Sequence, residues 1–211
     1  MGRAKNTELR EKISAHAVKL FSEKGYVNTS FADIARECGV ERTIVQYYFP
    51  YKDILIREFL DKCLKKVAEM AEELSEERFD AFGRAYFMGV ASFEFIINCK
   101  KMEKMALDII ESRQLTSLII PLYCQWDKWL TGDDFQEDAT IMAIGGAYEL
   151  LYHYMKNGIE ISSEFLAEKS YYVFTSWHGV SHERAKEKLL EYCITEEEVK
   201  AAAKKIEKAL F

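Results

Sequence analysis

The segment SFADIARECGVERTIVQYYF, residues 30–49, restricts the possible folds of this chain more than any other stretch. Ser30 and Asp33 have the spacing of a Ser-x-x-Asp capping box, which favours the start of a helix. Gly39 can adopt the left-handed backbone that ends a helix. A second helix must end by Phe49, because Pro50 disfavours helix in the residue before it. The segment therefore predicts two short helices joined by a turn.

The second of these helices carries polar, cationic and aromatic side chains within RTIVQYY. A short helix of this kind, placed after a tight turn, can enter the major groove of DNA as part of a helix-turn-helix. An ordinary helical hairpin is the alternative. The flanks favour the first interpretation, because apolar residues at helical spacing precede the segment from Leu9 to Phe21, and Gly25 ends that run. A long helix from about Tyr51 to Leu74 follows.

With these flanks, the segment Leu9–Leu55 resembles the DNA-binding domain of the tetracycline-repressor (TetR) family of transcriptional regulators. The residues that carry the resemblance are Ala17, Phe21, Gly25, Tyr26, Ser30, Ile34, Ala35, Gly39, Val40, Tyr48, Phe49, Lys52 and Leu55. The resemblance implies an all-α protein with two parts: a three-helix helix-turn-helix domain over residues 1–55, and a helical ligand-binding and dimerisation domain over residues 56–211.

The same resemblance suggests which residues meet DNA. Gln46 and Tyr47 are expected to read or adjoin base edges, with Arg42 and Thr43 nearby and with Ile44 and Tyr48 closer to the core-facing side. The alternative is that Gln46 is only a tolerated surface residue. Phosphates are expected at Tyr51, Lys52 and the helix start at Thr29 and Ser30. The chain departs from the family at Glu41, Thr43 and Gln46, where Ser, Gly and Tyr are usual. Glu41 is an anion near the reading helix, and it can accept a hydrogen bond from cytosine.

The charge of the chain is distributed unevenly. The net charge is −6, yet residues 1–55 carry nine Lys or Arg and seven Asp or Glu, a balance of +2. Basic groups are therefore concentrated where DNA is expected. The five cysteines are scattered in apolar helical context and are expected to be reduced core residues. No apolar run is long enough to cross a membrane, and the first residues lack the apolar core of a signal peptide, so the cytoplasm is the expected location.

The remaining sequence predicts further helices. They are expected at about Glu76–Cys99, Met102–Ser112, Thr116–Leu130, from Asp133 or Asp134 to Lys156, from Ser162 or Ser163 to Trp177, from Ser181 to Cys193, and from Thr195 to the end of the chain. Pro121 should kink its helix or mark its start. The helix containing ATIMAIGGAYELLYHYM is apolar nearly all round. It is expected to form a homodimer interface together with Ser163–Trp177; a central core helix within one subunit is the alternative.

Aromatic and methionine residues between Phe79 and Trp129 predict either core packing or an apolar ligand cavity large enough for a drug-sized molecule. That cavity is expected among the helices spanning Phe79–Leu130, closed by the helix around Tyr148. The expected lining residues are Tyr86, Phe93, Glu94, Met102, Tyr123, Trp126, Tyr148 and Tyr152. Glu94 lies in an apolar setting and is expected to face solvent; an inward Glu94 would favour a cationic ligand.

Enzyme and metal motifs are not found in the sequence, so we expect no catalytic residues, no metal and no cofactor. His178 and His182 have helical metal-ligand spacing, but Gly179 lies between them and a surface pair is expected. The sequence thus predicts a homodimeric, ligand-responsive regulator. It would bind a palindromic operator in double-stranded DNA, and a small apolar or aromatic effector would release it. The alternative is a helical small-molecule-binding protein without operator binding.

Overall fold

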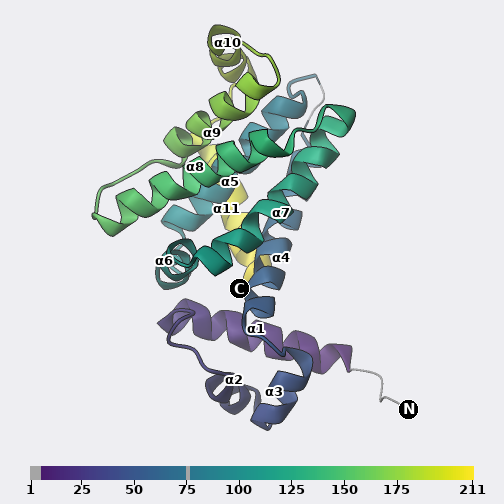
Figure 1. The fold of residues 1–211 in the computed structure, drawn as a ribbon, viewed down its shortest axis with the longest axis vertical. Coiled ribbons are helices and arrows are strands. Elements are labelled where there is room, and N and C mark those ends of the chain that lie inside the picture. The colour runs from purple at the N-terminus through teal and green to yellow at the C-terminus, as the bar shows by residue number, and fades with distance from the viewer. Residues whose placement is uncertain (1–5, 75–76) are drawn as a thin grey trace.

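A computed structural model of the chain describes residues 6–74 and 77–211, and Figure 1 shows its arrangement. Every regular element in this part of the chain is helical. The N-terminal helices are α1 (Thr7–Lys24), α2 (Phe31–Cys38), α3 (Arg42–Tyr48) and α4 (Asp53–Glu72). The helices that follow are α5 (Ala81–Asn98), α6 (Glu103–Glu111), α7 (Arg113–Thr131), α8 (Glu137–Lys156), α9 (Ser163–Trp177), α10 (His182–Tyr192) and α11 (Glu196–Leu210). The expected all-α class and the helix-turn-helix at its N-terminal end are confirmed.

The helix boundaries follow from local capping. In α2 the hydroxyl of Ser30 accepts from the Asp33 amide, and the Asp33 carboxylate accepts from the Ser30 amide, so both halves of the expected capping box form. Gly39 ends α2 in the left-handed region at φ 69°. The second expected box, between Thr195 and Glu198, begins α11 in the same way. These caps satisfy amides that would otherwise lack partners at a helix start.

The helices form two units joined by α4. Helices α1, α2 and α3 lie together at one end of the molecule, and α4 leads from them into the larger helical unit (Figure 1). In that unit α5 is central, because it packs against α4, α7, α9 and α11. The side chain of Phe211, at the chain end, reaches the core, where its ring lies 5.8 Å from the ring of Phe59 on α4. No helix in the described ranges has both the length and the apolar character needed to cross a membrane.

Two local expectations were wrong, and one of the two alternatives for Pro121 is excluded. Asp133 and Asp134 do not cap α8; they lie in a short 3-10 turn, and Gln136 precedes the helix without a side-chain cap. Pro121 lies inside a continuous α7 and does not mark its start. The helix expected from Glu76 begins at Ala81, where Asp80 caps it, and Glu76 itself lies outside the described residues.

Candidate DNA-reading helix and ligand core

Helix α3 presents a polar and aromatic outer face. Arg42 and Thr43 are exposed, Tyr47 is 51% exposed and Gln46 is half-buried. Buried residues anchor the opposite side of the helix: Val45, Tyr48 and Phe49. Ile44 is 38% exposed, so the expectation that it faces the core was wrong, whereas Tyr48 does face the core.

The anchor of α3 is tied to α1. The backbone amide of Asn6, which caps α1, donates to the Tyr48 hydroxyl at 3.0 Å. The guanidinium of Arg10 lies over the Phe49 ring, 4.8 Å from its centroid, and forms an ion pair with Glu58 on α4. These contacts hold the end of α3 against α1, and a rigid reading helix loses little entropy on binding.

Lys52 has a role within the fold. Its ammonium group donates to the carbonyl oxygens of Tyr26 at 2.7 Å and Thr29 at 2.9 Å, and lies 4.0 Å from the centroid of the Tyr26 ring. Burial lowers the pKa of Lys52. The ammonium therefore clamps the loop before α2 onto the start of α4. Its expected contact with phosphate remains a prediction, and that contact would have to use the one remaining proton.

The start of α2 already holds an anion. The Asp33 carboxylate is bonded to Ser30 and lies 3.0 Å from the ammonium of Lys24. These partners, Ser30 foremost, hold the pKa of Asp33 well below its usual range. The Thr29 side chain is 1% exposed, and its hydroxyl donates to the Gly25 carbonyl at 2.7 Å. The Thr29 side chain therefore faces inward, and the expected phosphate contact through the N–H groups of this helix start stays a prediction. Ser30 and Tyr51 are exposed, as a phosphate contact requires.

Helix α6 connects the N-terminal unit to the core. The carboxylate of Asp108 accepts from the Val27 amide at 3.0 Å, and Lys104 donates to the Glu23 carbonyl at 2.6 Å. The backbone at Gly25 has a φ of +87°, which favours glycine, and a Cβ there would lie 2.6 Å from Asp108 Oδ2, so the carboxylate would have to shift. The other side of α6 is buried in the core through Met105 and neighbouring apolar residues.

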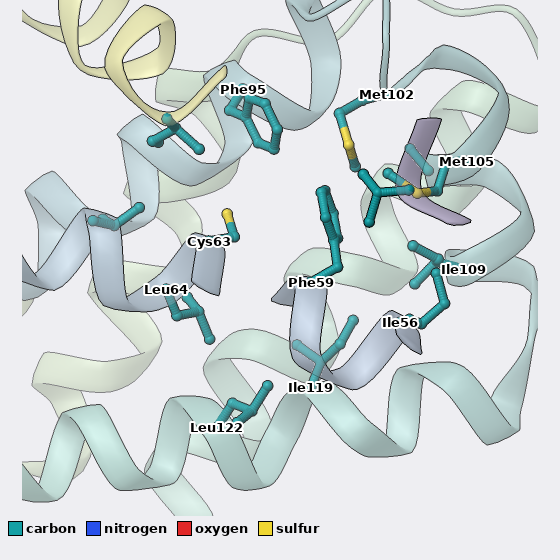
Figure 2. Packing of buried hydrophobic residues seen from close by; sticks show 14 of the residues in the cluster. Ile56, Phe59, Cys63, Leu64, Phe95, Met102, Met105, Ile109, Ile119 and Leu122 are labelled. Atoms are coloured by element: carbon teal, nitrogen blue, oxygen red, sulfur yellow. The ribbon is translucent and has the colours of Figure 1, made fainter. Parts of the chain in front are cut away.

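The core contains a first cavity of about 30 Å³ between α4, α5, α6 and α7. Figure 2 shows the apolar side chains that converge there: Phe59 and Cys63 from α4, Phe95 from α5, Ile109 from α6 and Ile119 from α7. Met102, Tyr123 and Tyr148 also line it, as the sequence led us to expect. The participation of α4 was missed, because its apolar face resembles ordinary packing in the sequence.

A second cavity of about 40 Å³ lies between α5, α7, α8 and α9. It brings together four of the expected lining residues: Tyr86, Phe93, Tyr123 and Trp126. Tyr123 lines both cavities, so its ring stands between them. Burial raises the pKa of the Tyr123 hydroxyl to about 12, which keeps it neutral.

The remaining two expected lining residues lie outside these cavities. Glu94 is 8% exposed, so the expectation that it faces solvent was wrong. It accepts a hydrogen bond from the Ser163 hydroxyl at 2.7 Å and borders a surface groove between α5, α9 and α11. Tyr152 lines a different surface groove, between α6, α7 and α8.

Asp127 on α7 was not anticipated. It is 9% exposed, lines the second cavity, and accepts from the Thr140 hydroxyl at 2.7 Å through Oδ2. Burial raises the pKa of Asp127 to about 6, against the opposing effects of Thr140 and His178. The signal in the sequence was its position four residues after Tyr123, on the apolar side of the helix.

Neither interior cavity is large enough for a drug-sized molecule, which needs roughly 300 Å³ or more. The expected cavity of that size stays a prediction: the two cavities of the core measure about 30 and 40 Å³, whereas the groove between α6, α7 and α8, lined by Tyr148 and Tyr152, measures about 510 Å³. A ligand of ordinary size can enter this core only if its helices move apart.

A short anchored helix with an exposed polar face, preceded by a capped helix and a left-handed glycine, defines a helix-turn-helix DNA-binding protein. The sequence pattern of the bacterial regulatory proteins of the tetR family matches residues 13–59. Residues 13–59 thus match the pattern of the TetR family, and over part of its length the chain is similar to HTH-type transcriptional regulators.

Among curated proteins, the chain is similar to the biofilm operon icaADBC HTH-type negative transcriptional regulator IcaR of Staphylococcus epidermidis. The identity is 24% over 90 residues, covering 43% of this chain and 46% of that protein. It is also similar to the uncharacterized HTH-type transcriptional regulator YuxN of Bacillus subtilis, with 39% identity over 54 residues, 26% of this chain and 19% of that protein. The similarity thus spans less than half the length of each of these relatives.

The fold resembles a solved TetR-family transcriptional regulator from Streptomyces coelicolor. The TM-score is 0.54 at 16% identity, covering 99% of this chain and 91% of that one. This likeness confirms the fold beyond the matched N-terminal segment.

Proposed function

We propose that the protein is a homodimeric repressor that binds a palindromic operator and is released from it when a small molecule opens its core. The observation that carries the proposal is the outer face of α3, where Arg42, Thr43 and Tyr47 are exposed above a buried anchor. The similarity to IcaR, which is named as a negative transcriptional regulator, supports repression as the outcome. This function would be carried out in the cytoplasm.

Helices α8 and α9 pack against each other. Their outer faces, which remain exposed, support dimerisation. Large apolar side chains are exposed there: Ile141 and Met142 on α8, and Phe165 and Trp177 on α9. A Cβ at Gly146 would meet nothing within 4 Å, so a second helix can approach closely. A second copy of this chain covering these faces would bury the apolar surface and present two α3 helices, as two successive major grooves about 34–36 Å apart require.

Two helices, α4 and α6, line the first cavity and also contact the helix-turn-helix unit, which supports coupling between effector binding and DNA binding. Phe59 and Cys63 of α4 line the first cavity, while the start of α4 binds Tyr26 through Asp53, with an oxygen–oxygen distance of 2.5 Å. Ile109 of α6 lines the same cavity, while Asp108 holds the loop after α1. A ligand that widened the cavity by displacing α4 or α6 would also change the position of α3.

The structural neighbour FadR of Bacillus subtilis, solved in complex with stearoyl-CoA, supports a ligand-binding core in this fold. It has a TM-score of 0.52 at 17% identity and covers 81% of this chain and 99% of that one. In this proposal the core has a closed and an open conformation. An effector would favour the open conformation only by the difference between its affinities for the two states.

The experiment is a titration of fluorescent DNA duplexes with the protein. One duplex carries the palindrome nearest the gene, and the other has the same composition in scrambled order. Proposed operator binding predicts at least about a thousandfold preference for the palindrome at physiological salt. It also predicts one dimer for each palindrome. Equal weak binding to both duplexes, or none, would overturn the operator proposal and favour a ligand-binding protein without DNA recognition.

A further inference from the structure

A surface groove of about 790 Å³ lies between α5, α9 and α11. Its volume is within the range of roughly 300–1,000 Å³ that is usual for small-molecule sites. Among the described residues, the groove shares only Phe95 with the first cavity and none with the second. Apolar side chains from α5, α8, the loop before α9 and α11 form part of its lining: Ile97, Met155, Ile159, Ile161, Val199 and Ala203. This part of the lining suits an aliphatic chain.

A buried carboxylate, that of Glu94, belongs to the same lining. Its Oε2 accepts from the hydroxyl of Ser163, the first residue of α9, at 2.7 Å. Its Oε1 accepts no hydrogen bond from residues 6–74 or 77–211, and no ion pair joins Glu94 to a cation in those ranges. Glutamate is rarely this buried without a charged partner. The hydroxyl supplies a hydrogen bond but no positive charge, so the burial of this carboxylate is only partly compensated.

The charges around the groove are predominantly negative. Five carboxylates and two ammonium groups belong to its described lining: Glu94, Glu160, Glu164, Glu196, Glu207, Lys200 and Lys204. Lys200 forms an ion pair with Glu196, four residues before it on α11. Glu196, and more weakly Glu94 and Glu164, raises the pKa of Lys200. Neither Glu160 nor Glu164 is paired with a cation within the residues that the structure describes. The groove therefore favours a positively charged ligand.

We propose that this groove binds a primary alkylammonium ion, with the ammonium group at Glu94 and the aliphatic chain on the apolar lining. A primary ammonium has three N–H donors, and one of them satisfies Oε1 of Glu94 while its charge compensates the buried carboxylate. A quaternary ammonium has no such donor. The inference goes beyond the proposed function, because the groove lies outside the core that an effector would open. It keeps the cationic ligand that an inward Glu94 implies but places it between α5, α9 and α11.

The test compares probes that differ in one property at a time. Hexylammonium carries the proposed charge and chain, 1-hexanol replaces the ammonium by a neutral hydroxyl, and ethylammonium shortens the chain by four methylenes. Binding of each to the purified full-length protein is followed by NMR titration in the absence of DNA. We expect hexylammonium to bind about tenfold or more tightly than 1-hexanol, because only the ammonium forms a charge-assisted hydrogen bond. It should exceed ethylammonium by a similar factor, because more apolar surface is buried.

Two variants locate the site. Glu94→Gln keeps the shape and can still accept from Ser163, and we expect it to reduce hexylammonium affinity about tenfold while changing hexanol affinity less than about twofold. Asp127→Asn is the matched control, since it neutralises another buried carboxylate, which lines the second cavity and not the groove. It should leave hexylammonium affinity unchanged. Thermal unfolding of each variant confirms that it is folded.

The proposal is overturned if the wild-type protein binds hexylammonium and 1-hexanol equally, a result that needs no variant. It is also overturned if Asp127→Asn removes the preference and Glu94→Gln does not, because the cation would then lie in the core. Hexyltrimethylammonium that binds as tightly as hexylammonium would exclude the hydrogen bond to Oε1 and with it the proposed class of ligand. Because no DNA is present, failure here leaves operator binding standing. Conversely, a protein that never binds DNA can still show the preference for hexylammonium.

Discussion

The capping residues of α2 in the helix-turn-helix unit bond to partners three residues away, whereas the buried carboxylates of the core bond to residues far away in the chain. Ser30 and Asp33 cap α2 from three residues apart. In the core, Glu94 accepts from Ser163, 69 residues on, and Asp127 accepts from Thr140, 13 residues on. A nearby partner is formed as soon as the helix forms. A distant one exists only after the whole core has assembled, so the burial of its charge must be offset by that assembly or by a ligand.

The largest expected effect tests whether Asp127 destabilises the folded core. The folded pKa of Asp127 is about 6, above the usual value near 3.8, so the folded chain holds this proton where the unfolded chain has lost it. Stability contributed by the protonated carboxyl therefore falls as the pH rises from about 4 to about 6. Asp127→Asn should increase the free energy of unfolding at pH 7–8 by up to about 3 kcal/mol, and the gain should vanish near pH 4. Urea unfolding across this pH range measures it. A loss of stability at pH 7 would show that the charge is already compensated.

The next largest effect is on DNA affinity and concerns the outer face of α3, which is exposed, unlike the core. Gln46→Ala should reduce affinity for the preferred DNA site by about 1–3 kcal/mol and relax the preference at one base pair per half-site, because glutamine can pair with adenine through two hydrogen bonds. Thermal stability should stay constant, since Gln46 is only half-buried. Binding to a library of operator variants is the measurement. An unchanged base preference would remove Gln46 from the reading face.

A substitution at Lys52 tests whether its ammonium group stabilises the fold or contacts a DNA phosphate. Lys52→Met keeps the apolar stem but loses both hydrogen bonds to carbonyl oxygens, so stability should fall by about 1.5 kcal/mol. Because the ammonium serves the fold, the salt dependence of DNA binding should hardly change. Unfolding and salt titration are measured on the same preparation. A slope that falls by about one unit per half-site at unchanged stability would instead establish the phosphate contact.

The smallest expected effect tests whether a capping box contributes the same stability in both units. Ser30→Ala removes one half of the capping box of α2 and should cost about 1 kcal/mol of stability. Thr195→Ala is its counterpart in α11, within the larger unit, and should cost a similar amount because the geometry of the two boxes matches. Chemical denaturation of both variants provides the comparison. If the two losses differ severalfold, capping energy depends on the surrounding unit rather than on the local box.

The sequence allowed prediction where the interactions are local. The start of α2, the left-handed turn at Gly39 and the capping box of α11 were all predicted, because each depends on residues within a few positions. The inward turn of Glu94 and the burial of Asp127 depend on helices that come together only in the folded chain. The size of the cavities also could not be predicted, because aromatic side chains that fill a core and those that line a space have the same spacing along a helix.

The contact between Gly25 and Asp108 has a consequence for how such sequences can diverge. Any side chain at position 25 would meet the Asp108 carboxylate and would also have to adopt a backbone conformation that suits glycine. The two positions are 83 residues apart in sequence, yet they should evolve together. In relatives that share this crossing of α1 and α6, a residue other than glycine at the first position should accompany a shorter side chain at the second. Substitutions at positions 25 and 108, which lie at the junction between the two units, would then appear together in the same relatives.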